Sequence, residues 1–299
     1  MIDPDSFGVS FSIKQCRNFG IDPKETLYWL ISEAGFGRFR LMSYWDECEK
    51  TKGTLDFTEL DAQIEAVQKA GGKIILCLGA RQPRWPENHW PEWAWSESKA
   101  DRSTDLLSFI TTVGNRYKAR ACIVSWQLEN EALLANFGQK SEVDRARLKQ
   151  EFQLVKRLDP DRPVIMTTST SWGIPLRRPI PDIVGFSYYQ IVYNSKKHKY
   201  SLSFHKPWLD RLRAGAIKLI WHRPSFIHEL QLEPWGPKNI WEMDAIEQDK
   251  SMSTTQITSN IAQAKATRLQ PVDLWGGEWW YWRLKQGDSS IWQTVRKSL

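Results

Sequence analysis

The sequence ACIVSWQLENE, residues 121–131, is an apolar run that ends abruptly in Glu129 and Glu131. A short apolar run of this kind predicts a buried strand, with the carboxylates at its carboxyl end. The sequence PSFIHELQ, residues 224–231, repeats the pattern and brings Glu229 to the end of a second buried strand. Strands that are apolar throughout are typical of parallel sheets, whose two faces are both covered. These two stretches therefore favour a parallel α/β fold with polar residues at the strand ends.

Strand and helix patterns alternate along the whole chain, which predicts a parallel sheet. The residues after the first expected strand, 12–15, contain no glycine-rich phosphate loop of the kind a doubly wound sheet carries. Eight strand–helix units fit one closed (β/α)8 barrel, which needs roughly 250 residues. We expect strands at residues 7–12, 38–43, 73–78, 121–128, 162–168, 181–187, 224–228 and 272–276. We expect helices at residues 22–33, 56–69, 101–117, 141–158, 208–214, 255–269 and 290–297.

The bulk properties suit one catalytic barrel domain covering residues 1–299. No apolar stretch reaches the roughly 18 residues of a transmembrane helix. The net charge of +6 is scattered, and residues 196–199 form the one short basic cluster, so no nucleic-acid-binding face is expected. We expect a monomer. No signal peptide is visible, which predicts a cytoplasmic protein or a secreted one whose leader has been removed.

The cysteines and histidines give no sign of a metal site or a cofactor. None of Cys16, Cys48, Cys77 and Cys122 belongs to a CxxC pair, and the five histidines show no HExxH spacing. Cys77 and Cys122 lie in apolar runs and are expected to be buried free thiols. The predicted chemistry therefore depends on carboxylates alone, with no metal and no cofactor.

Glu131 and Glu229 are the predicted catalytic pair. Two facing carboxylates can hydrolyse a glycosidic bond, one as general acid and base and the other as nucleophile. We assign the first role to Glu131, which Asn130 precedes with an amide able to bind a sugar hydroxyl. Glu129 would share a strand face with Glu131 and remains an alternative. An exposed glutamate at a helix start is the other interpretation of Glu131.

Glu229 is the predicted nucleophile because it lies at the end of the second buried strand. Its alternatives are Glu233, which lies beyond the strand and before Pro234, and a structural ion pair between Glu229 and an arginine. Pattern alone leaves both open.

The two motifs carry a resemblance to a known group of enzymes. Trp126-Gln127-Leu128-Glu129-Asn130-Glu131 resembles the Asn-Glu signature at the end of strand four in the retaining glycoside hydrolases of clan A. His228-Glu229-Leu230-Gln231 resembles the nucleophile strand, strand seven, of the same clan. The first motif is also similar to that of some β-galactosidase families. The resemblance implies a (β/α)8 barrel, a retaining mechanism, and carboxyl groups about 5–5.5 Å apart.

Further substrate-binding positions follow from the resemblance. Arg40 corresponds to an arginine that hydrogen-bonds near the nucleophile, and Tyr189 to a tyrosine whose hydroxyl touches it, with Tyr188 as its neighbouring alternative. Trp279 corresponds to the tryptophan under the reacting sugar. That last position is crowded, because the same stretch also contains Trp275, Glu278, Trp280 and Trp282.

The chain contains 17 tryptophans, more than a core of this size needs. Four fall in one proline-broken stretch after the third expected strand, including Trp85 and Trp90, where flat rings would suit the apolar faces of sugars. Trp235 and Trp45, after other strands, are expected on the same face. The alternative is a loop that packs its own aromatic rings.

These patterns together predict a retaining β-glycoside hydrolase that cuts within a polysaccharide such as a β-glucan or a β-mannan. An exo-acting β-glycosidase similar to β-galactosidases and a transglycosylase use the same residues. A barrel that binds carbohydrate without cleaving it is the alternative of another class. The presence of both carboxylates favours catalysis.

Overall fold

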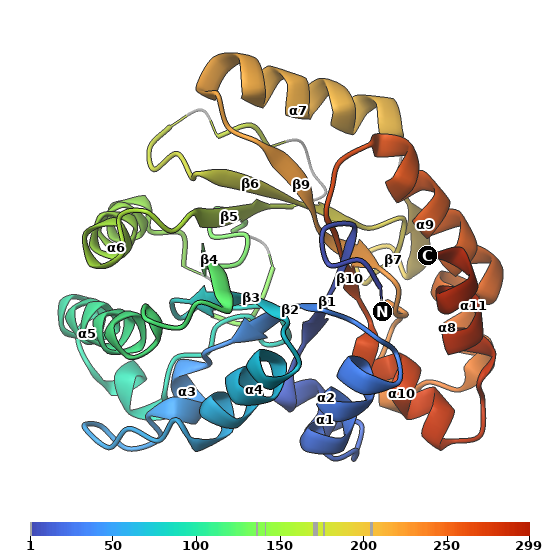
Figure 1. The fold of residues 1–299 in the computed structure, drawn as a ribbon, viewed down its shortest axis with the longest axis horizontal. Helices are drawn as coiled ribbons and strands as arrows, with labels where there is room; N and C mark the ends of the chain where they lie inside the picture. Colours follow the sequence, from blue (N-terminus) through green and yellow to red (C-terminus); the bar gives the residue numbers. More distant parts are fainter. Residues whose placement is uncertain (1, 136, 141, 170–172, 176, 204–205) are drawn as a thin grey trace. The chain divides into compact units, whose positions relative to one another are not determined.

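The computed structural model describes residues 2–135, 137–140, 142–169, 173–175, 177–203 and 206–299. Within these residues, eight parallel strands form a closed barrel in the order β1-β10-β9-β6-β5-β4-β3-β2 (Figure 1). The predicted (β/α)8 barrel is therefore confirmed. Contacts within the chain gather in two units, residues 1–37 with 186–299 and residues 38–185. That residues 1–299 act as one catalytic domain stays a prediction.

The unit of residues 38–185 contains the strands and helices of the first Asn-Glu motif. β2 pairs with β3, β3 with β4 and β4 with β5, all in parallel. Side-chain caps begin its two long helices, because Ser98 accepts from the backbone of Asp101 and Asp144 from that of Arg147. Its elements are β2 (Arg38–Met42), α3 (Trp45–Cys48), α4 (Thr58–Lys69), β3 (Lys73–Leu78), η1 (Glu92–Ser96), α5 (Lys99–Tyr117), β4 (Ile123–Leu128), α6 (Arg145–Leu158) and β5 (Val164–Thr168).

The unit of residues 1–37 and 186–299 contains the second motif. β10 pairs in parallel with β1 and with β9. The elements before β6 are β1 (Phe7–Phe11), α1 (Ile13–Asn18) and α2 (Pro23–Ser32). From β6 onward they are β6 (Ile183–Tyr188), which crosses the boundary of the units, β7 (Ile191–Asn194), β8 (Lys199–Leu202), α7 (Pro207–Trp221), β9 (Ser225–Gln231), η2 (Ile240–Glu242), α8 (Ala245–Met252), α9 (Thr254–Thr267), β10 (Val272–Trp275), α10 (Gly277–Lys285) and α11 (Ser290–Ser298).

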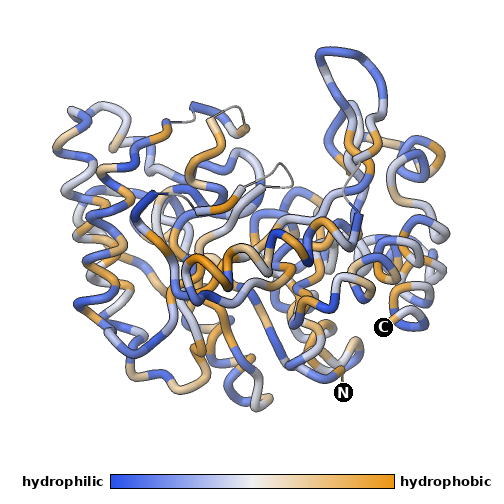
Figure 2. Tube along the Cα trace, turned by 90° about the horizontal axis from the view of Figure 1, so that it is seen from above, coloured by the Kyte–Doolittle hydropathy of each residue, from blue (hydrophilic) through white to orange (hydrophobic). Residues whose placement is uncertain are grey.

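The strands are buried because both of their faces are covered, as the apolar runs predicted. β1, β2 and β10 are buried at every position. Figure 2 shows that hydrophobic residues occur in short runs along the trace, separated by hydrophilic stretches. Cys16, Cys48 and Cys77 are buried free thiols, and burial raises the pKa of Cys48 to about 12. Cys122 is only partly buried, which corrects its expected burial.

The structure departs from the expected elements mainly in the second half of the chain. The helix expected at 208–214 is the longer α7, and β7 and β8 form an antiparallel hairpin that the pattern did not predict. The basic residues 196–199 lie at its turn. The helix expected to begin at residue 141 begins at Arg145, after the Asp144 cap, and residue 141 lies outside the described residues. No helix in the described part of the chain is long and apolar enough to cross a membrane.

Candidate active site

The backbone after β4 is held in an unusual conformation at both glutamates. Glu129 has a φ of 46° and Glu131 a φ of 43°, in the left-handed region that side chains other than glycine rarely adopt. Such conformations persist only where the surroundings enforce them, and they cluster at functional sites. Gly79, at the end of β3, makes room here, because a Cβ on it would lie 2.7 Å from Cγ of Glu129.

Glu129 is held in a buried ionic cluster with two residues of α6. Its Oε1 accepts from the backbone amides of Ala80 and Arg81, at 3.2 and 3.3 Å, and its Oε2 lies 3.4 Å from the Arg147 guanidinium. Arg147 also donates to Glu151 at 2.9 Å. Both oxygens of Glu129 are therefore used by the protein itself. This arrangement favours Glu131 over Glu129 as the residue that acts on a substrate.

Asn130 is held by four buried side chains, and its backbone amide donates to the carbonyl of Arg81 at 2.7 Å. Its Oδ1 accepts from Arg40 at 2.9 Å and from Thr167 at 3.1 Å. Its Nδ2 donates to Glu87 at 3.0 Å, and its carbonyl accepts from Arg81 at 2.7 Å. With Oδ1 occupied by donors, the Nδ2 group keeps one further hydrogen that the contact with Glu87 does not use.

Arg40 and the backbone of Glu131 are both hydrogen-bonded to members of this cluster. Arg40 is completely buried and also donates to Gln127 at 2.6 Å. In this arrangement Arg40 orients Asn130, and none of its own surface is exposed for contact with a sugar. The backbone amide of Glu131 donates to Thr167 Oγ1 at 2.6 Å, which fixes the start of the loop that carries the carboxylate.

A β-bulge places Glu229 at its position in β9. Val272 pairs with Ile227, but Leu274 pairs with Leu230, so β9 has one more residue than β10 between these pairs. His228 and Glu229 thus both lie opposite Asp273, and Nδ1 of His228 lies 2.6 Å from Oδ2 of Asp273. Bulges of this kind redirect side chains and are common next to active sites.

Tyr189 lies against Glu229, and Trp235 packs against Tyr189. The Tyr189 hydroxyl donates to Oε2 of Glu229 at 3.2 Å, and the ring of Trp235 packs edge-on against that of Tyr189 with 5.5 Å between centroids. The hydroxyl of the alternative, Tyr188, instead lies 3.5 Å from Gln263. The described contacts therefore favour Tyr189.

Gln231, which the sequence did not single out, holds Tyr189 in place. Its Oε1 accepts from the backbone amides of Gln190 and Ile191, and its Nε2 donates to the carbonyl of Ile191 at 2.6 Å. These bonds join the end of β9 to the residues that follow Tyr189. Glu233, the alternative nucleophile, lies beyond the end of β9.

Two of the predicted sugar-binding tryptophans are core residues. Trp279 is completely buried in α10, where its Nε1 donates to Gln248 at 2.9 Å. Trp90 is buried against Trp45, and the guanidinium groups of Arg102 and Arg147 lie over its ring. The burial of both rings does not favour the stacking role expected for them, which stays a prediction.

Trp85 differs from the other predicted tryptophans of its loop. It is 55% exposed and packs against Phe137. Its loop is tied to the Asn130 cluster, because Glu87, two residues further on, accepts from Asn130. Within the loop Trp90 packs against Trp95, and outside it against the completely buried Trp45 of α3, which agrees with the alternative of a loop that packs its own aromatic rings. Among the tryptophans near Trp279, Trp275 lies at the end of a strand, β10, whereas Trp280 and Trp282 lie in α10.

Several site residues escaped the sequence analysis for identifiable reasons. Thr167 lies inside an expected strand, but nothing in the pattern marks a hydroxyl there as a partner of Glu131. Glu87 lies in a loop without a regular pattern. Arg147 and Glu151 look like exposed charges of a helix until α6 is placed against β4.

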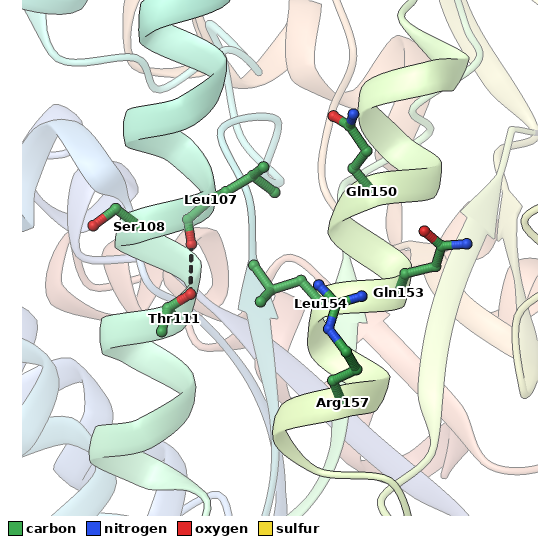
Figure 3. Close-up of a pocket in the computed structure, with 7 residues that line it drawn as sticks. All are labelled: Leu107, Ser108, Thr111, Gln150, Gln153, Leu154 and Arg157. Atoms are coloured by element: carbon green, nitrogen blue, oxygen red, sulfur yellow. Dashed lines mark hydrogen bonds between the residues drawn. The ribbon is translucent and has the colours of Figure 1, made fainter.

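A surface groove lies elsewhere in the unit of residues 38–185. It has a volume of about 330 Å³ and lies between α5 and α6 (Figure 3). None of the predicted site residues lines it. Its lining residues are Leu107, Ser108, Thr111, Gln150, Gln153, Leu154 and Arg157.

Comparison with known proteins gives matches to glycoside hydrolases. Residues 25–106 match the family model of glycoside hydrolase family 42, described as β-galactosidase. The β-galactosidase BgaH of Haloferax lucentense is 27% identical over 119 residues, covering 34% of this chain and 18% of that protein. The chain thus matches less than a fifth of this curated relative.

Two solved structures show the same fold. A thermostable mutant of the xylanase Xyn10A from Cellvibrio japonicus has a TM-score of 0.63 at 16% identity, covering 99% of this chain and 97% of that one. The β-galactosidase of Halorubrum lacusprofundi has a TM-score of 0.60 at 14% identity, covering 90% and 52%.

The solved structures share the (β/α)8 barrel fold with this chain, and the sequence matches, which cover only part of it, are to glycoside hydrolases, in agreement with the resemblance of the two motifs. Within that class, the sequence match is to the β-galactosidase family.

The buried cluster on α6 predicts a pH dependence of stability. Burial, with Glu129 nearby, raises the pKa of Glu151, while Arg147 opposes the shift. The folded state therefore binds a proton on Glu151 at pH values where the unfolded chain, with a pKa of about 4.3, has lost it. This contribution to the free energy of unfolding is present at acidic pH and decreases as the pH rises above about 4.3.

We expect Glu151→Gln to remove that decrease, because glutamine cannot ionise and can still accept from Arg147. Denaturant unfolding of both proteins across pH 4 to 9 measures the difference. Glu65→Gln, an exposed site on α4, is the matched control and should follow the wild type. Parallel curves for wild type and Glu151→Gln would show that Glu151 is ionised in the folded protein throughout.

Proposed function

We propose that this protein is a retaining β-glycoside hydrolase with Glu131 as general acid and base and Glu229 as nucleophile. The observation that carries the proposal is the hydrogen bond from the Tyr189 hydroxyl to Glu229, at 3.2 Å. A donor at this position stabilises the ionised carboxylate and fixes the direction of one of its oxygens. Glu229 lies near the carboxyl end of β9 and Glu131 lies three residues after the end of β4, the region where enzymes of this fold keep their catalytic residues.

The reaction would proceed in two steps. In the first, an oxygen of Glu229 attacks the anomeric carbon, and Glu131 gives its proton to the leaving oxygen as the glycosidic bond breaks. In the second, Glu131 takes a proton from water, and the water oxygen displaces Glu229 from the anomeric carbon. The protein ends in its starting protonation state, and no metal or cofactor takes part.

The buried groups around Asn130 would orient the substrate. Arg40 and Thr167 occupy Oδ1 of Asn130, and Glu87 accepts one hydrogen from its Nδ2. The second Nδ2 hydrogen can then donate to a sugar hydroxyl beside the cleaved bond. Trp85, exposed on the attached loop, would stack on a sugar further along the chain.

Two substrate classes have specific support. The matches to β-galactosidases over part of the chain favour an exo-acting β-galactosidase. The exposed ring of Trp85 supports the endo-acting enzyme on a β-glucan or β-mannan, although the burial of Trp90 removes part of the reason for expecting a long cleft. Transglycosylation by the same residues requires a sugar acceptor in place of water.

The catalytic pair is tested by substitution. We expect Glu131→Gln and Glu229→Gln each to lower hydrolysis of an activated aryl β-glycoside, or of a cleaved glycan, by several orders of magnitude with the fold unchanged by circular dichroism. Glu129→Gln is not a suitable control because it breaks a buried ion pair, whereas Glu233→Gln should keep most of the activity.

The same enzyme should give a product of retained anomeric configuration by NMR, since carboxyl groups about 5–5.5 Å apart act with retention. An inverted product would exclude the covalent intermediate. An active Glu229→Gln variant together with an inactive Glu233→Gln variant would assign the role of nucleophile to Glu233.

The role of Tyr189 has a matched control one residue away. We expect Tyr189→Phe to lower kcat/KM by roughly ten- to a hundred-fold, since a hydrogen bond to a charged group is worth about 1.5–3 kcal/mol. Tyr188→Phe removes a hydroxyl that is bound to Gln263 and should change kcat/KM less than twofold or so. Equal losses in the two variants would show that the hydroxyl acts only through packing.

Product size separates the two substrate classes. A panel of β-galactosides and β-linked polysaccharides, analysed for chain length of the products, shows whether cleavage is internal or terminal. If Trp85 is a distant sugar platform, Trp85→Ala should raise KM for long substrates about tenfold and leave kcat/KM for aryl glycosides near the wild-type value. Release of monosaccharide alone, with no effect of Trp85→Ala, would exclude the endo-acting enzyme and support the exo-acting β-glycosidase.

A further inference from the structure

Helix α7 buries two charged residues and exposes several large apolar ones. The buried residues are Asp210 and Arg213, which lie 3.8 Å apart, and Ile217, and the Arg213 guanidinium packs over the ring of Phe186 at 4.0 Å. The helix exposes four large apolar side chains: Trp208 at 52%, Leu212 at 62%, Leu219 at 80% and Ile220 at 51%. Helices that cover a barrel usually turn their apolar residues inward. The outward apolar side of α7 therefore needs an explanation outside the barrel.

Three of these four residues form one stripe. Trp208, Leu212 and Leu219 follow each other at intervals of four and seven residues, which places them along one side of the helix. Gly215 lies between them, and a Cβ on it would meet no atom within 4 Å, so the stripe is continuous and unobstructed. Over its 15 residues α7 extends for about 22 Å.

The charges around the stripe all have one sign. Asp210 is the one acidic residue of α7, and it is buried, while Arg211 and Lys218 are exposed, as is Lys206 just before the helix. Helix α9 packs beside α7 (Figure 1), contains no acidic residue, and is followed by the exposed Arg268. The stripe thus lies on a surface that would attract a negatively charged partner and repel a positive one.

We propose that α7 docks this protein on an anionic lipid bilayer, with its apolar stripe in the interface and its basic residues against the headgroups. Helices that lie in the plane of a membrane combine tryptophan and leucine on one side with lysine and arginine beside them. A second copy of this chain fits less well, because two α7 helices would bring their arginines and lysines together. The proposal goes beyond the proposed hydrolase and does not depend on it.

A matched control exists in the same unit. Ile246 on α8 is 77% exposed, as exposed as Leu219, but its helix contains the acidic residues Glu247 and Asp249. Removing an exposed apolar side chain at either position changes the surface and not the core. If substitution weakens membrane binding at Leu219 but not at Ile246, the effect belongs to α7 and not to exposed apolar side chains in general.

The test is co-sedimentation of the full chain with vesicles of phosphatidylcholine alone and with about a third phosphatidylglycerol. We expect binding to the anionic vesicles only, weakened about tenfold by Leu219→Gln and by Lys218→Glu, and unchanged by Ile246→Gln. Tryptophan fluorescence of wild type and Trp208→Phe follows the same binding, and a blue shift that Trp208→Phe loses places that ring in the bilayer.

Several outcomes would overturn the proposal. They are no binding to anionic vesicles, equal weakening by Leu219→Gln and Ile246→Gln, and a dimer in sedimentation velocity that Leu219→Gln dissociates. Binding that free heparin abolishes and that Leu219→Gln leaves intact would indicate a purely electrostatic site for polyanions. Hydrolysis of a soluble substrate by Leu219→Gln, compared with wild type, reports separately on the proposed activity.

Discussion

The candidate site depends on the buried guanidinium of Arg40. A charged group completely removed from water is tolerated only where acceptors satisfy it, and here the side chains of Gln127 and Asn130 accept from it. The need to satisfy Arg40 fixes the amide of Asn130 in one orientation. Thr167 then joins the side chain of Asn130 to the backbone of Glu131. The start of the segment that carries the Glu131 carboxylate is thus fixed by a buried charge on β2, two strands earlier in the sequence.

The sequence was sufficient for the barrel and for the two strands that deliver Glu131 and Glu229. Both follow from short apolar runs ending in carboxylates, a local pattern that needs no knowledge of tertiary contacts. The sequence was insufficient to choose between Glu129 and Glu131, because strand alternation puts both on one face. The contacts of Arg147 and of the amides after β3 supply the difference, and they come from residues that only the fold brings to Glu129.

The tryptophans show a different limit. Trp85 and Trp90 lie five residues apart in the same proline-rich stretch, yet one is exposed and the other is enclosed by two guanidinium groups. Composition indicates how many aromatic rings are present, but the facing helices α5 and α6 decide which rings are covered. The bulge in β9 is likewise invisible in the sequence, because it is a relation between β9 and β10 and not a property of either strand.

Polarity in this chain is placed by specific partners more than by the usual rule of apolar inside and polar outside. Arg40, Arg147 and Arg213 are all buried, each against acceptors or an aromatic ring that suits a planar guanidinium. At α7 the buried Arg213 packs over Phe186 of β6, on the side of the helix that also buries Asp210 and Ile217. The helix can therefore carry an apolar surface on its outer side, because Trp208, Leu212 and Leu219 are not among these inner residues.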